Sequence, residues 1–413
     1  MKLIVLAVFL LLSMYKLILE YLDYKNRNAP IPDNVKDIYD EETYKKRNEY
    51  ETESARLSLI EELVHLPLYF IILMLNIHCF LFEYAARFSE NVYFRTFFMF
   101  GAMTVLFSVI IDSIFGWYDT FVIEEKYGFN KTTLRTFISD SLKHLILMQC
   151  LISGGGVALF MYLYFTFGNQ VFFIFFFVIA AFIVILVFFN HFFSKLFNKF
   201  APLEEGPLRD KILELAKKTE YPVKRVYIMD GSRRSTRLNA YFTGFGKSKT
   251  IVLFDTLVEK MTEDEVTAVL AHEIGHAKHK HTLKGVPFTI LVVATLLLIA
   301  RFVVGQASIS NAFGFEELNI AFGLYISLVI STPLLLPATL PLNTLTRKYE
   351  RDSDAYAAKH ANAESLISAL KKLARENFSN LTPHPIVVKL THSHPTISQR
   401  VEYLERSGQG LEH

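Results

Sequence analysis

Seven apolar segments, each long enough to cross a lipid bilayer as a helix, constrain this chain more than any other feature. With 52% hydrophobic and only 20% charged residues, the chain carries more apolar surface than a soluble core requires. We therefore expect a mainly α-helical, polytopic membrane protein. The segments are 3–20, 64–86, 97–118, 144–167, 171–194, 286–305 and 319–341.

The first segment has a second interpretation, as a cleaved signal peptide that follows Lys2. It lacks a small-x-small cleavage site, and its apolar side continues from Leu17 to Leu19. The residues therefore favour an uncleaved helix.

Basic residues are concentrated in alternate loops between these segments. Loop 21–63 holds seven Lys and Arg residues, and loops 119–143 and 195–285 are also basic. The other three loops hold only Arg87 and Arg95. Because Lys and Arg mark the cytoplasmic loops of membrane proteins, we expect the basic loops and the segment after 341 to face the cytoplasm.

The motif that most directly indicates a chemical activity is His272-Glu273-x-x-His276. Residues four apart share one face of a helix, so both imidazoles can reach one metal ion, and Glu273 can take a proton from an attacking water. Thr262 and Glu265 have the spacing of a capping box and predict where this helix begins. The pattern is typical of zinc proteases, and its alternative is a pair of structural histidines.

Two histidines leave a catalytic zinc ion one protein ligand short. Glu350 and Asp354 are four apart in a charged helical segment, so one carboxylate could bind the metal while the other orients an imidazole. Glu350 is the better ligand candidate. In another class of zinc proteases, a Gly lies three residues after the second His and a third His lies six residues after it. Here those two positions hold His279 and Thr282, so this class does not fit. His279 and His281 remain conceivable ligands, but the neighbouring lysines favour a solvated helix end.

The loop 195–285 contains the pattern of a small folded unit. A helix is expected over 208–218 and strands over 223–229, 238–244 and 250–254. A strand beside the metal helix could hold an extended peptide by main-chain pairing. The alternative is a hairpin that is only structural.

Several of these segments together resemble the type I CAAX prenyl endopeptidases, integral-membrane zinc proteases that mature farnesylated peptides and prelamin. The resemblance covers most of the chain. It rests on 120–130, 230–232, 239–244, 251–257, the 272–276 motif, 347–354, Ser393-His394-Pro395 and Arg400.

This resemblance implies a barrel of seven helices around a large chamber, with a zinc site at its cytosolic end. It implies one Zn²⁺ held by His272, His276 and Glu350, with Glu273 as the base. The resemblance further implies that Asp354 is a carboxylate supporting a zinc ligand, that His394 stabilises the oxyanion, and that Arg400 is the nearby Arg. It also implies that Asn239 and Ala240 lie on a substrate-pairing strand.

We accordingly expect a zinc endopeptidase that removes the C-terminal tripeptide from prenylated CAAX proteins. One alternative is a quality-control protease that uses the same chemistry on unprenylated or misfolded membrane proteins. A transporter or channel with a structural zinc would explain polar residues inside the spans, such as His78, Asp112 and Arg301, without hydrolysis. A receptor or scaffold with a vestigial zinc site is a further alternative. The intact Glu273 argues against a vestigial site.

The expected organisation has four parts. Residues 1–194 form helices one to five with cytosolic loops 21–63 and 119–143, and 195–285 form the metalloprotease segment. Helices six and seven occupy 286–341, and 342–413 form a cytosolic segment whose last residues, 411–413, resemble an expression-vector remnant. The expected partners are a lipidated peptide and the bilayer, in the endoplasmic reticulum or a bacterial inner membrane. The net charge of +2 gives no basis for binding nucleic acid.

Overall fold

The computed structural model describes residues 1–147, 155–194, 198–221, 223–243 and 249–408. The expected vector remnant, 411–413, and residues 148–154 of the fourth predicted span lie outside this part. The helices of the first half are α1 (Lys2–Asn26), α2 (Glu41–Met74), α3 (Ile77–Ala85), α4 (Val92–Thr104), α5 (Asp112–Tyr118), α6 (Glu125–Tyr127), α7 (Leu134–Ile146), α8 (Val157–Phe167) and α9 (Val171–Ser194). Short 3₁₀ or π turns are η1 (Asp33–Ile38), η2 (Val105–Ile111), η3 (Asp119–Glu124), η5 (Gly168–Gln170) and η6 (Gly231–Arg233).

The second half contains a small sheet and the remaining helices. The strands are β1 (Phe200–Pro202), β2 (Val223–Met229), β3 (Ala240–Thr243) and β4 (Lys249–Phe254). The helices are α10 (Pro207–Lys218), α11 (Asp255–Lys260), α12 (Glu263–Lys278), α13 (His281–Val304), α14 (Ala307–Ala312), α15 (Ile320–His360), α16 (Ala363–Glu376), α17 (Pro385–Thr391) and α18 (Ile397–Gly408).

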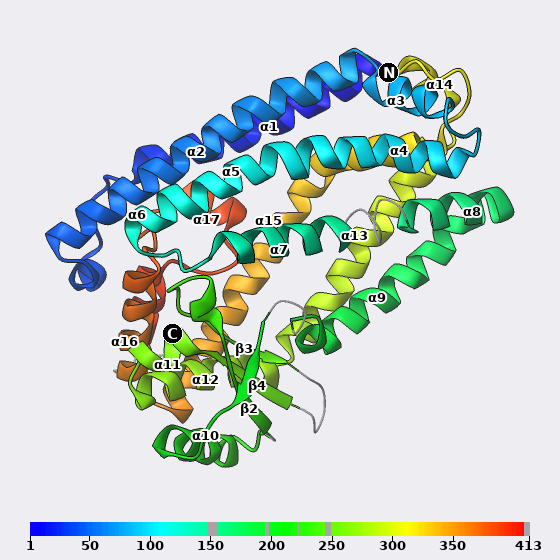
Figure 1. The fold of residues 1–413 in the computed structure, drawn as a ribbon. Coiled ribbons are helices and arrows are strands. Elements are labelled where there is room, and N and C mark those ends of the chain that lie inside the picture. Colours follow the sequence, from blue (N-terminus) through cyan, green and yellow to red (C-terminus); the bar gives the residue numbers. More distant parts are fainter. Residues whose placement is uncertain (148–154, 195–197, 222, 244–248, 409–413) are drawn as a thin grey trace.

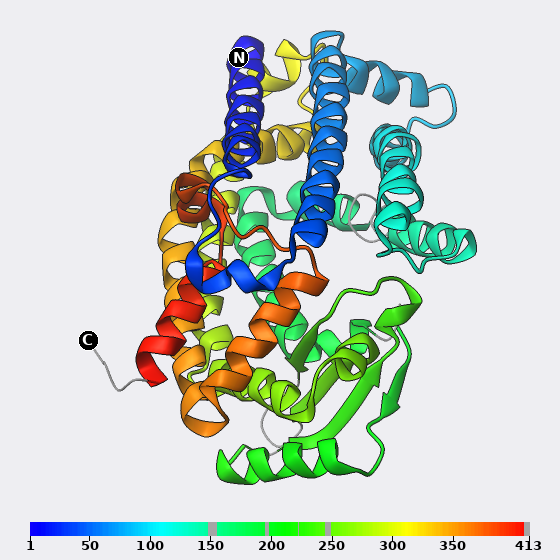
Figure 2. The same cartoon turned by 90° about the vertical axis from the view of Figure 1, so that its left-hand side faces the viewer.

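The long apolar helices and the sheet occupy different ends of the molecule (Figure 1). Helices α1, α2, α4 and α5 lie at one end with the N-terminus, and the sheet lies at the other with α10, α11 and α12. The turned view shows the same separation, with α15 running between the two ends (Figure 2). Helix α15 therefore links the apolar end to the sheet end, and α13 runs between the same two ends beside it.

Five stretches of the described chain are long and apolar enough to cross a membrane: Lys2–Asn26, Glu41–Met74, Val92–Tyr127, Val157–Leu186 and His281–Val304. The fourth comprises two arms, α8 and α9, joined by a turn at 168–170. Helix α15 adds a shorter apolar stretch, Ile320–Ser331. Counting α8 and α9 separately and adding α15 gives seven apolar stretches among the described residues, a number consistent with the seven predicted spans. The protein is a multi-pass, mainly helical membrane protein.

The second span differs from its predicted bounds. Helix α2 begins at Glu41, inside the predicted loop 21–63, and ends at Met74, so the predicted helix to residue 86 is wrong. Asp40 caps the start by accepting a hydrogen bond from the Thr43 amide. Asn76, with φ of 56°, turns the chain out of the helix before α3. Hydropathy located the apolar residues, but these local turn and cap signals set the helix ends.

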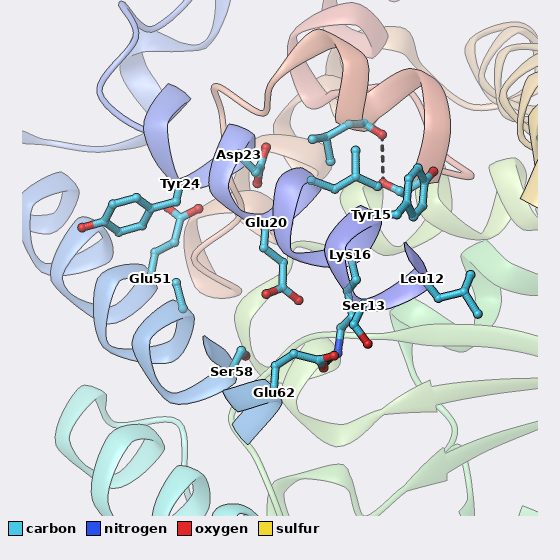
Figure 3. A pocket seen from close by; sticks show the side chains of 14 residues that line it. Leu12, Ser13, Tyr15, Lys16, Glu20, Asp23, Tyr24, Glu51, Ser58 and Glu62 are labelled. Atoms are coloured by element: carbon cyan, nitrogen blue, oxygen red, sulfur yellow. Dashed lines mark hydrogen bonds and ion pairs between the residues drawn. The ribbon is translucent and has the colours of Figure 1, made fainter. Parts of the chain in front are cut away.

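Charged side chains line a cavity of about 710 Å³ among the apolar helices (Figure 3). It lies between α1, α2 and α17, and Lys16 of α1 pairs with Glu62 of α2 at 2.7 Å. A second cavity of about 600 Å³ lies beside α5 and α7. Ionisable residues are costly in lipid unless they face protein or water, so these cavities account for part of the polar content of the spans.

The sheet has the strand order β1-β2-β4-β3. Strands β2 and β4 are parallel, whereas β1–β2 and β3–β4 are antiparallel, and Ala240 of β3 pairs with Leu253 of β4. The helix and three strands expected in this unit are present, and β1 was not predicted. Apolar residues of β4, α12 and α16 form one buried core, including Ile251, Leu270 and Leu370. This core holds α12 against the sheet.

Candidate metal centre

The helix that carries the His motif begins as the sequence predicts. Thr262 accepts a hydrogen bond from the Glu265 amide, and Glu265 Oε2 accepts one from the Thr262 amide at 2.8 Å, so both halves of the capping box are present. Ser368 and Lys372 of α16 also donate to the Glu265 carboxylate, at 2.6 and 2.7 Å. The start of α12 is thereby tied to α16, and His272 and His276 follow on one helix face.

A glycine lets α12 approach α15 closely between the two histidines. A Cβ atom placed on Gly275 would lie 3.0 Å from Ser353 Cα and 3.1 Å from Tyr356 Cβ. Real Cβ atoms rarely tolerate contacts this close, so a larger residue would push the helices apart. Because Ser353 lies between Glu350 and Asp354 on α15, this crossing sets how far both carboxylates reach toward α12.

Three side chains converge at this crossing with the geometry of metal ligands. The Nε2 atoms of His272 and His276 are 3.1 Å apart. Glu350 Oε2 lies 3.5 Å from His272 Nε2, and Glu350 Oε1 lies 3.2 Å from His276 Nε2. Ligands about 2.0–2.2 Å from a tetrahedral ion lie roughly 3–3.5 Å from one another. The three residues therefore fit one divalent ion.

A second group of imidazole and carboxylates lies among the apolar helices: Glu61, His65 and Asp112. His65 Nε2 is 3.0 Å from Asp112 Oδ1, and the Asp112 side chain is 46% exposed. The Glu350 side chain, in contrast, is only 5% exposed. Within the described residues, the group at the α12–α15 crossing is thus the better enclosed candidate metal centre.

Asp354 and Arg400 support the inner side of His272. Asp354 Oδ1 lies 2.8 Å from His272 Nδ1, so it can fix this ring with Nε2 turned toward Glu350. Arg400 of α18 donates to both Asp354 oxygens, at 2.6 and 2.9 Å. Burial opposes ionisation of Asp354, but the Arg400 guanidinium and His272 hold the pKa of this carboxyl below its usual range.

Glu273 follows His272 and lines the same cavity as the three metal-ligand candidates. Burial raises the pKa of this carboxyl above its ordinary value. A carboxylate with a raised pKa is a stronger base than a solvated one, which suits proton transfer near neutral pH.

His394 lies in the segment between α17 and α18. Its Nδ1 is 3.0 Å from Glu350 Oε2, and its side chain is 65% exposed. The imidazole thus stands at the open side of the cavity, beside the Glu350 carboxylate.

One cavity of about 360 Å³ brings the predicted site residues together. Eight of the nine line it: Asn239, Ala240, His272, Glu273, His276, Glu350, His394 and Arg400. Asp354 is fully buried behind them. Ala240 begins β3, which pairs only with β4 among the described strands, so the other edge of β3 has no strand partner there; β3 lies next to α12 and α9. The Asn239 side chain accepts a hydrogen bond from the Ala240 amide at 2.8 Å.

Comparisons with known proteins show the family of this chain. Residues 202–407 match the model of peptidase family M48, and residues 20–199 match that of the CAAX prenyl protease N-terminal region with five membrane helices. CAAX prenyl protease 1 of Saccharomyces cerevisiae is 30% identical over 415 residues, which cover 93% of this chain and 91% of that protein. The chain belongs to peptidase family M48.

Within this family it is a membrane metalloprotease of the CAAX prenyl protease 1 type. The homologue from Oryza sativa is 31% identical over 414 residues and covers 93% of each chain. The crystal structure of S. mikatae Ste24p superposes with a TM-score of 0.90 at 30% identity and covers 98% of this chain and 99% of that one. The fold and the family expected from the sequence are confirmed.

Sequence reasoning missed three features of this M48 protease site. His281 was expected in a solvated helix end, which is wrong because it is only 5% exposed and contacts His276. The second missed feature is the close packing of α12 on α15 at Gly275. The apolar cavity wall from α16 was also missed, although its members recur at helical spacing: Leu366, Leu370 and Leu373.

Proposed function

We propose that this M48 protease is a zinc-dependent endopeptidase that removes the C-terminal tripeptide from prenylated CAAX proteins and peptides. The observation that carries the proposal is a single cavity containing two imidazoles, a ligand carboxylate, a second carboxylate suited as base and an open strand edge. The relatives, CAAX prenyl protease 1 of Saccharomyces cerevisiae and the homologue from Oryza sativa, suggest the substrate class by their names.

His272, His276 and Glu350 are the proposed metal ligands. Two imidazoles and one carboxylate are a donor set that zinc takes in catalytic sites with an open position. When bound there, zinc supplies a Lewis acid that polarises a carbonyl group and lowers the pKa of water to about 7.

Glu273 is the proposed general base and acid. It accepts the proton of the attacking water and then gives it to the amine of the leaving peptide. His394 donates a hydrogen bond to the oxygen that becomes negative in the transition state, since its ring lies beside Glu350 at the open side of the cavity. Arg400 acts behind them by holding Asp354 against His272.

Strand β3 is the proposed substrate-pairing edge. An extended peptide that adds to this edge at Asn239 and Ala240 runs along the same cavity as the metal ligands. The leucines of α16 form an apolar wall in this cavity, which suits an aliphatic substrate side chain. A prenyl chain attached to the peptide has the neighbouring membrane helices as its apolar environment.

The basic loops support a topology in which this site faces the cytoplasm. The membrane is the endoplasmic reticulum if the source is eukaryotic and the inner membrane if it is bacterial. In this topology the C-terminal part of α15, with Glu350, also faces the cytoplasm. This is necessary because the site contains residues of both α12 and α15.

The deciding experiment is cleavage by the purified full-length protein of two peptides that share one CAAX sequence, one farnesylated and one not. Mass spectrometry of the products maps the cut. The proposal expects release of the last three residues from the farnesylated peptide, at a much higher kcat/KM than from the unmodified one. Equal cleavage of both would support a quality-control protease, and ligand flux through liposomes without any cleavage would support a transporter.

A further inference from the structure

His281, the first residue of α13, lies directly behind the metal-ligand candidate His276. The Nδ1 atoms of the two rings are 3.0 Å apart, which is hydrogen-bond distance. Tyr349 stacks on the His281 ring with centroids 4.0 Å apart and planes within 10° of parallel. Tyr349 immediately precedes Glu350, so the helix that provides the ligand carboxylate also holds His281 in place.

The direction of this hydrogen bond follows from the role of the other ring nitrogen of His276. His276 Nε2 faces His272 Nε2 at 3.1 Å and Glu350 Oε1 at 3.2 Å. A neutral imidazole that binds a metal through Nε2 carries its proton on Nδ1. His276 Nδ1 is then the donor, and His281 Nδ1 must be the acceptor.

The acceptor role assigns the proton of His281 to its Nε2. This Nε2 is buried and has no hydrogen-bond partner among the described residues. A buried N–H without a partner is unfavourable, and packing alone does not require a histidine at this position. A buried histidine at position 281 is explained if the site requires its Nδ1 atom as the hydrogen-bond acceptor for His276.

We propose that His281 is a positioning residue that fixes the tautomer and ring orientation of His276 for metal binding. It does for His276 what Asp354 does for His272, whose Nδ1 lies 2.8 Å from the Asp354 carboxylate. The two supports differ in charge, because the histidine is a neutral acceptor and the aspartate an anionic one. The site thereby orients both imidazoles without burying another negative charge. This inference rests on the proposed metal function.

The test uses variants that separate the acceptor from the ring. His281→Phe keeps an aromatic ring against Tyr349 but has no acceptor, whereas His281→Asn places a carbonyl oxygen near the position of Nδ1. His279→Phe is the matched control, since His279 is the exposed neighbouring histidine and stacks on His281 with ring centroids 5.4 Å apart. Each full-length protein is loaded with Zn²⁺ or Co²⁺ in detergent.

Metal affinity is measured by chelator competition, and the visible spectrum of the Co²⁺ form reports ligand geometry. We expect His281→Phe to bind metal about 10–100-fold more weakly, as is typical when an outer hydrogen-bond partner is lost. Its Co²⁺ spectrum should change. The Asn variant and the His279→Phe control should stay within a few-fold of wild type.

Wild-type affinity and spectrum in His281→Phe would overturn the proposal, and so would an Asn variant as weak as the Phe variant. If His281→Phe does not fold, His281→Leu takes its place, because leucine and asparagine have similar sizes and differ in the acceptor. None of these readouts involves peptide cleavage, so an error in the proposed substrate would not affect them. A wild-type protein that bound no stoichiometric metal would refute the proposed metal function itself.

Discussion

Glu350 and Asp354 stand one helical turn apart on α15 and face opposite nitrogens of the same imidazole. Glu350 Oε2 is 3.5 Å from His272 Nε2, and Asp354 Oδ1 is 2.8 Å from His272 Nδ1. A single helix therefore provides both a ligand candidate and the group that orients another. The position of α15 relative to α12 determines both contacts at once.

Changing Asp354 should weaken metal binding without removing a ligand. Asp354→Asn keeps the side-chain shape but loses the charge closest to Arg400, so the buried guanidinium retains only its longer contact with Glu350, at 3.6 Å. We expect metal affinity to fall by about 10–100-fold in chelator competition. Asp352→Asn, two residues away on the same helix, should behave like wild type. Equal effects from both substitutions would contradict the assigned role of Asp354.

Changing Glu273 should separate metal binding from catalysis. Glu273→Gln preserves the size of the side chain and removes the base, so peptide cleavage should fall by about 10²–10⁴-fold, the usual contribution of general acid–base catalysis. Metal content, measured by atomic emission, should remain that of wild type. Undiminished cleavage by a metal-loaded Glu273→Gln protein would rule out Glu273 as the base.

Adding one methyl group at Gly275 should separate α12 from α15. The new Cβ of Gly275→Ala would meet Ser353 Cα at 3.0 Å, and overpacking of this kind typically costs about 1–3 kcal/mol. We expect a lower melting temperature in detergent and weaker metal binding. Gly285→Ala is the control, because a Cβ atom there meets nothing within 4 Å. A Gly275→Ala protein with wild-type metal affinity would show that the close crossing does not set the site.

The capping carboxylate of α12 should make stability depend on pH in a known direction. Burial opposes ionisation of Glu265, but hydrogen bonds from Lys372, Ser368 and the Thr262 amide lower its pKa below the ordinary 4.5. Because the folded-state pKa is the lower one, this contribution is present above about pH 4.5 and is lost as the pH falls through the folded-state pKa.

We therefore expect Glu265→Gln to lower the melting temperature at pH 7 and to differ less from wild type near pH 4. Thr262→Ala removes the other half of the cap and should cost about 1 kcal/mol at both pH values. Thermal unfolding followed by circular dichroism measures both effects. A Glu265→Gln difference that grew as the pH fell would contradict the assigned ion pairing.

Local sequence signals predicted which side chains lie together in this cavity better than they predicted how the helices around it pack. The four-residue spacing of His272 and His276, and of Glu350 and Asp354, follows from helix geometry and so can be read from the sequence. That the two helices cross at Gly275 depends on tertiary packing, and no local pattern encodes it. His281 shows the same limit, since its neighbouring lysines indicated solvent while the start of α13 turns its ring toward His276.

The spans illustrate the difference between hydropathy and helix boundaries. Apolar residues located the membrane helices, but α2 extends to Glu41 through charged residues and stops at Met74. Asn76, in a left-handed conformation, explains that stop. Such a conformation is a property of one residue in its tertiary setting, which window-averaged hydropathy does not contain.

The 41 residues of α15 begin in an apolar stretch at Ile320 and continue past Glu350. At about 1.5 Å per residue, this is roughly 60 Å of helix along the chain. A bilayer that is thicker or thinner than the apolar stretch changes the tilt of such a helix. A change in tilt acts on the close crossing of α15 with α12 at Gly275, which holds Glu350 next to the two histidines. We therefore expect membrane thickness to act as a mechanical input to the geometry of the candidate metal centre.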